Sequence, residues 1–154
     1  MRKIFAALPV LVLIVNFSLS AQGLAGQNQY NLENGIALKG YDPVAYFTEH
    51  KPIKGEKQYA VEVQGATYFF SSSANKEEFQ KNPSKYKPQY GGWCAYAMGK
   101  DGSKVEVDPG TFKIIDGRLF LFYNQFFNNT LKSWNKDEVR LHRSADANWQ
   151  KIIQ

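Results

Sequence analysis

The chain has 154 residues, and its 19 basic and 14 acidic side chains give a formal net charge of +5 at pH 7. The positive charges are spread along the chain without a basic run, which disfavours nucleic acid as a partner. With one cysteine the chain cannot form an internal disulfide, so a disulfide-stapled scaffold is excluded, and the length suits a single domain.

The N-terminus has the pattern of an export signal. Arg2 and Lys3 precede an apolar run over residues 4–15, and small residues follow it. We therefore predict a signal peptide over residues 1–21, cleaved after Ser20 or Ala21, and a periplasmic or secreted protein. An uncleaved anchor is the alternative, although the run is shorter than the roughly 20 residues that span a bilayer. Cleavage leaves 17 basic and 14 acidic residues, no membrane span and a net charge of +3.

Residues 22–36 are polar and rich in Gly, Gln and Asn, so we expect a flexible leader before one domain over residues 37–154. Asp42 and Pro43 resemble an N-cap followed by proline in the first helical turn, which predicts a short helix at this point. Val44 and Phe47 are its expected inward-facing residues.

A β-hairpin is predicted next. Residues 59–63 alternate apolar and small or polar side chains, Gln64-Gly65 is a turn signal, and residues 67–70 form the return strand. A helix carrying Phe79 should follow, capped by one of Ser72, Ser73 or Asn75 and ended by Asn82-Pro83.

The segment from Gly91 to Gly99 contains the only cysteine. We expect Cys94 in the first turn of a short helix, where the helix dipole favours the thiolate, and Gly99 as a left-handed residue that ends the helix. Met98, four residues further on, should then share the face of Cys94.

Asp116-Gly117 is the strongest hairpin signal in the chain, with strands predicted over residues 111–115 and 118–123. Residues 125–154 have helical periodicity, and Ser144 or Asp146 is expected to cap the last helix. The predicted fold class is α+β: one small antiparallel sheet from two β-hairpins, packed with short helices and followed by a C-terminal helical extension.

Two segments, Gly-Tyr-Asp-Pro-Val-Ala-Tyr-Phe at residues 40–47 and Gln-Tyr-Gly-Gly-Trp-Cys-Ala-Tyr-Ala at residues 89–97, frame a strand Tyr-Phe-Phe-Ser-Ser at residues 68–72. Over residues 38–98 this pattern resembles the YHS domain family in its exported, single-domain variety. The resemblance implies a YHS-like core and handling of a transition metal, most often copper. The sequence departs from the family pattern at two positions where the family has cysteine, because this chain has Ala45 and Phe70 at those positions.

Soft-metal binding is therefore the first functional hypothesis. Cys94 is the expected principal ligand, with the thioether of Met98 and the imidazole of His50 as further ligands. Copper(I) suits two sulfur donors better than zinc or magnesium does. A metal-handling protein is then the expected partner.

The alternative is a module that binds a non-metal ligand or a protein, with Cys94 as a packed structural residue. Its ligand pocket would be formed by a group of aromatic residues and one carboxylate, namely Tyr41, Asp42, Tyr46, Tyr90, Trp93 and Tyr96. A thiol-dependent enzyme is a third alternative, which requires a histidine base beside Cys94. The only candidates are His50 and His142, and we expect no catalysis.

Overall fold

The computed structural model describes residues 29–154. The predicted signal peptide and the first part of the predicted leader lie outside these residues. The described elements are β1 (Leu32–Glu33), β2 (Ile36–Ala37), the 3-10 helix η1 (Leu38–Gly40), α2 (Ala45–Thr48), β3 (Glu56–Val63), β4 (Ala66–Phe70), α3 (Ser73–Lys81), α4 (Pro83–Tyr86), the 3-10 helix η2 (Gln89–Gly92), α5 (Ala95–Asp101), β5 (Asp108–Ile115), β6 (Arg118–Phe122), β7 (Asn124–Gln125), β8 (Asn128–Asn129), α6 (Thr130–Trp134) and α7 (Glu138–Ile153).

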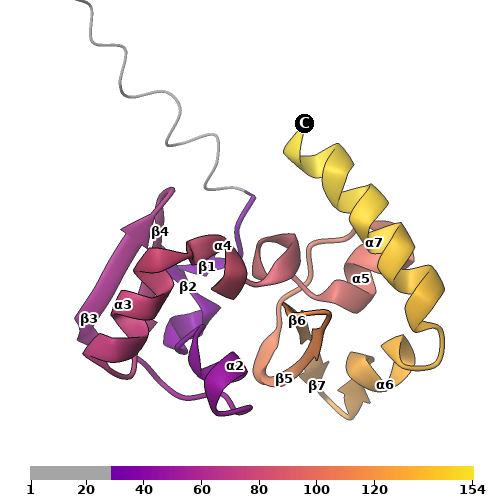
Figure 1. The fold of residues 1–154 in the computed structure, drawn as a ribbon. Helices are drawn as coiled ribbons and strands as arrows, with labels where there is room; N and C mark the ends of the chain where they lie inside the picture. Colours follow the sequence, from indigo (N-terminus) through magenta and orange to yellow (C-terminus); the bar gives the residue numbers. More distant parts are fainter. Residues whose placement is uncertain (1–28) are drawn as a thin grey trace, which may run out of the picture.

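The α+β class is confirmed, and both predicted hairpins form. The sheet arrangement differs from the prediction, because the hairpins β3–β4 and β5–β6 belong to separate sheets. The first sheet has the order β1-β2-β4-β3 and includes a parallel pair, β2 with β4. Figure 1 shows this sheet and α3 on one side of the molecule and α5 with α7 on the other.

The leader prediction is wrong for its described part. Residues 32–37 form the hairpin β1–β2, and the backbone N–H of Asn31 donates to the carbonyl of Gly91 over 2.8 Å. Polar composition suggested a flexible segment, but pairing with β4 supplies partners for its backbone groups.

The cap of α3 and its end at Asn82-Pro83 were predicted correctly, whereas the role of Asn82 as the cap of α4 was not predicted. Ser72 accepts a hydrogen bond from the N–H of Asn75 at the start of α3, and Asn82 accepts one from the N–H of Lys85 at the start of α4. Such side chains satisfy N–H groups that have no partner within the helix.

The C-terminal region differs from the helical prediction in two places. Residues 124–129 form the small hairpin β7–β8, and α7 runs from Glu138 to Ile153 without a new start at Ser144 or Asp146. Among residues 29–154 we find no helix with the length and apolarity needed to cross a membrane.

Strand β6 divides the core in two. Leu119 and Leu121 pack into a first cluster with residues of α2, β4 and α3, whereas Phe120 and Phe122 pack into a second cluster with α5, α6 and α7. Alternate side chains of a strand point to opposite faces, so this strand is buried on both sides. Most of the functional residues predicted from the sequence contribute to one of these clusters, whereas Asp42 and His50 belong to neither.

Candidate functional site

Asp42 is fully buried and its carboxylate is a structural hub. One oxygen accepts hydrogen bonds from the backbone N–H groups of Val44 and Ala45, at 2.8 and 3.3 Å. The other accepts from the N–H and hydroxyl of Ser71 and from the amide of Asn75, at 2.8, 2.7 and 2.7 Å. The carboxylate therefore joins the start of α2 to the end of β4 and to α3. As predicted, Asp42 caps N–H groups at the helix start, but α2 begins only at Ala45, so Pro43 precedes the helix instead of lying in its first turn. Asp42 does not line a pocket with the predicted aromatic residues.

Two of the predicted pocket tyrosines are core residues. Tyr46 is buried and donates to the carbonyl of Pro109 over 2.9 Å, and Tyr90 donates to Asp146 over 2.9 Å. Burial raises the pKa of both hydroxyls far above the ordinary value, so both remain protonated donors.

The other predicted aromatic residues are half-buried and lie apart. The indole N–H of Trp93 donates to the carbonyl of Gln29, whereas Tyr96 lines a cavity of about 410 Å³ with Cys94. Tyr41 lines a different cavity, and Tyr90 lines a third. The sequence predicted one aromatic pocket, but the fold distributes its members over three cavities and the core.

Cys94 is buried and immediately precedes α5, as its N-cap. Its sulfur accepts a hydrogen bond from the N–H of Tyr123 at 3.3 Å and lies 3.4 Å from the hydroxyl of Thr130. These two polar contacts, together with its place in the first core cluster, give the thiol a structural role in joining α5 to the start of α6.

The three predicted metal ligands do not converge. Met98 is buried in the second core cluster, whereas Cys94 is in the first, and His50 is exposed in the loop after α2. Cys94 precedes the helix with non-helical backbone angles (φ −58°, ψ 117°), so the four-residue helical spacing to Met98 does not place both on one face. Within residues 29–154 no three side chains of His, Cys, Asp or Glu are grouped as a metal site requires.

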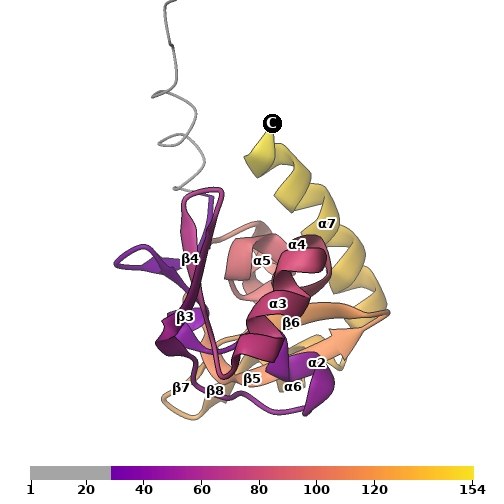
Figure 2. The same ribbon diagram turned by 60° about the vertical axis from the view of Figure 1, so that its left-hand side comes forward.

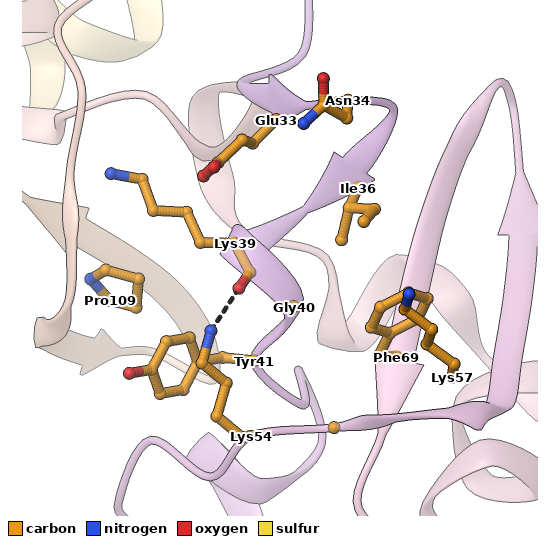
Figure 3. A pocket seen from close by; sticks show the side chains of 11 residues that line it. Glu33, Asn34, Ile36, Lys39, Gly40, Tyr41, Lys54, Lys57, Phe69 and Pro109 are labelled. Atoms are coloured by element: carbon orange, nitrogen blue, oxygen red, sulfur yellow. Dashed lines mark hydrogen bonds between the residues drawn. The ribbon is translucent and has the colours of Figure 1, made fainter.

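A lysine-lined pocket of about 530 Å³ lies where β1, β2 and η1 meet the start of β3. Lys39, Lys54 and Lys57 line it, together with a single carboxylate, Glu33. Figure 3 shows these side chains around Ile36 and the rings of Tyr41 and Phe69. The pocket thus combines an excess of positive charge with aromatic and aliphatic walls.

The pocket depends on a close approach of two chain segments. A Cβ on Gly55 would lie 2.4 Å from the backbone carbonyl carbon of Phe69, so only glycine fits between Lys54 and the following strand. Gly55 also donates its N–H to the carbonyl of Gly40 over 2.9 Å. The two glycines thereby hold the lysine-bearing loop against η1.

Two of the three lysines are partly engaged. The ammonium of Lys54 donates to the carbonyl of Lys39 over 2.6 Å and lies 4.2 Å from the centre of the Tyr41 ring. The ammonium of Lys39 lies 3.4 Å from the carboxylate of Glu106, which is 57% exposed. Lys57 is exposed at the same rim. These lysines retain donors that a negatively charged ligand would accept from.

Sequence reasoning found only Tyr41 of this pocket. The three lysines form no run, and Gly55 was not among the residues predicted to form a site. The glycine that follows Lys39 and the one that follows Lys54 were the available signal, because both mark places of close backbone approach.

Comparison with protein-family models gives one result: residues 44–90 match the YHS domain. The match runs from the start of α2 through the β3–β4 hairpin, α3 and α4 to η2. The YHS resemblance that the motifs indicated is therefore found over residues 44–90. Comparisons with curated proteins and with solved structures gave no significant match.

Proposed function

We propose that the chain is a binding module whose lysine-lined pocket takes a small anion with an apolar or aromatic part. The observation that carries this proposal is the composition of the pocket: three lysines and one carboxylate surround Phe69 and Tyr41. Such a pocket offers charge and hydrogen-bond donors to a carboxylate or phosphate, and apolar contact to the rest of the ligand.

The expected contribution of each lysine is modest. Lys54 and Lys57 are exposed and therefore screened by water and salt, so each is worth about 1 kcal/mol, or roughly fivefold in affinity. Glu33 is the only carboxylate at the rim and opposes an anion. The two kinds of side chain therefore predict changes of opposite sign.

The test is a titration of the ¹⁵N-labelled protein with inorganic phosphate and with an aromatic carboxylate, benzoate, followed by NMR. We expect shifts at the backbone amides of Gly40 and Gly55, weaker binding in Lys57→Gln and tighter binding in Glu33→Gln. Lys81→Gln, on α3, is the matched control and should leave the affinity unchanged. Shifts spread over the whole surface, or equal effects of the two lysine variants, would reject the pocket.

Metal binding is the second proposal, because YHS domains are associated with metal handling. What supports it is that Cys94 lines a cavity together with Tyr96, Tyr123 and Thr130, although the Cys94 side chain itself is buried. Soft copper(I) is the metal that a thiolate prefers. Titration of copper(I) into the protein and into Cys94→Ser tests it, and equal uptake by both rejects the site.

We also propose that the protein is exported and loses residues 1–21. The support is the charge and hydropathy pattern of the N-terminus. Intact-mass measurement of the protein recovered from the extracytoplasmic fraction checks this, and a mass that retains Met1–Ala21 there contradicts the cleavage.

A further inference from the structure

The turn between β7 and β8 presents two phenylalanines to solvent. Phe126 and Phe127 are the two residues of this turn, with exposed fractions of 87% and 111%. Their φ angles are 51° and 63°, which is the pattern of a type I′ hairpin turn. In the views of Figures 1 and 2 this hairpin lies at the end of the molecule opposite the C-terminus.

The fold gains nothing from two phenylalanines at this turn. Type I′ turns favour Asn-Gly, because both central residues adopt positive φ, which is strained for a bulky side chain. Because the rings of Phe126 and Phe127 are exposed, they bury almost no apolar surface within the chain. The advantage of these two residues must therefore come from contact with something outside the chain.

The segment that carries the tip is polar and contains no carboxylate of its own. Residues 117–136 contain no Asp or Glu, and they include Lys132, which is exposed on α6 directly after the hairpin. The hairpin strands themselves consist of Asn and Gln. Asp101 and Asp108 lie on neighbouring segments and accept hydrogen bonds from Ser103 and Gly110, which do not remove their negative charge.

The small size of the tip favours a lipid surface over a protein as its partner. A specific protein interface buries about 800 Å² on each side, which a two-residue tip cannot provide alone. A lipid interface instead accepts isolated Phe rings at the boundary between headgroups and acyl chains, and the nearby Lys132 favours anionic lipids. We propose that Phe126 and Phe127 insert into the interfacial layer of an anionic lipid bilayer and dock the domain on a membrane surface.

The experiment is co-sedimentation of the mature protein with vesicles of phosphatidylcholine and phosphatidylglycerol, mixed at roughly 70:30, because the anionic lipid gives the surface a negative potential. Replacing both rings in F126N/F127G should weaken binding at least about tenfold, since two buried aromatic contacts are lost. This variant keeps residues that suit a type I′ turn, so it should fold. Val139→Ser is the matched control, because Val139 is 75% exposed on α7 and should not affect binding.

A second readout locates the contact. Phe127→Trp should retain binding, and its added fluorescence should shift to the blue when vesicles are present. Failure of the unmodified protein to sediment overturns the proposal, and so does equal binding by F126N/F127G. Loss of a wild-type self-association in F126N/F127G, measured by sedimentation velocity without lipid, would instead assign the tip to a protein contact.

Discussion

Replacing Asp42 by Asn tests whether the buried carboxylate holds the start of α2 against β4 and α3. The substitution keeps the shape of the side chain and one carbonyl oxygen. That oxygen can still accept from the N–H groups of Val44 and Ala45, which contact one carboxylate oxygen. The new NH₂ group then faces Ser71 and Asn75, which both donate to the other oxygen.

The magnitude follows from how many of these donors can adapt. The Ser71 hydroxyl can rotate to accept, and the Asn75 amide can turn over to present its oxygen. The backbone N–H of Ser71, which lies 2.8 Å from the carboxylate, can do neither and loses its acceptor. An unsatisfied buried donor costs about 1–3 kcal/mol, and the charge-assisted bonds are lost as well, so we expect about 2–4 kcal/mol in total.

Urea denaturation followed by tryptophan fluorescence measures this change in the free energy of unfolding. Asp137→Asn is the matched control: Asp137 pairs with Arg140 at an exposed position and should cost less than about 1 kcal/mol. A loss of under about 1 kcal/mol in Asp42→Asn would refute the reasoning, because it would mean that the carboxylate holds nothing in place.

Three further experiments test other parts of the structure. Gly99→Ala should cost about 2 kcal/mol or more in urea denaturation, because its Cβ would lie 2.4 Å from the carbonyl oxygen of Leu141; an unchanged midpoint contradicts the packing of α5 on α7. Buried Cys94 should react with iodoacetamide only as fast as the native protein opens, so rapid labelling without urea contradicts its burial. The hydrogen bond from Lys113 lowers the pKa of Glu138 below its ordinary 4.5, so its stabilisation is present above pH 4.5 and is lost as the pH falls through the lowered pKa. Glu138→Gln should reduce the acid sensitivity of unfolding, and identical pH profiles would count against this.

The interpretation of Cys94 shows where local pattern reasoning failed. A helix was predicted correctly at this place, but Cys94 was expected in its first turn and instead precedes it, because the helix begins at Ala95. A residue outside the helix does not follow helical spacing, so Met98 points into the second core cluster. Likewise Gly99 was expected to end the helix with a left-handed conformation, which Gly102 adopts instead at φ 79°.

The sequence by itself determined the elements that depend on near neighbours. Turn residues such as Asp116-Gly117, caps such as Ser72 and the alternation in β3 act over a few residues, so the hairpins and middle helices were predictable. The family motifs also predicted the YHS match, which is found over residues 44–90.

Only the tertiary structure decided which distant segments meet. The pairing of β2 with β4, the burial of β6 on both faces and the gathering of Lys39, Lys54 and Lys57 around Phe69 all join residues far apart in the chain. No short-range pattern encodes such meetings, because they result from packing the apolar faces of all the elements together. The candidate pocket therefore depends on the tertiary structure, whereas the hairpins and helices around it could be predicted from the sequence.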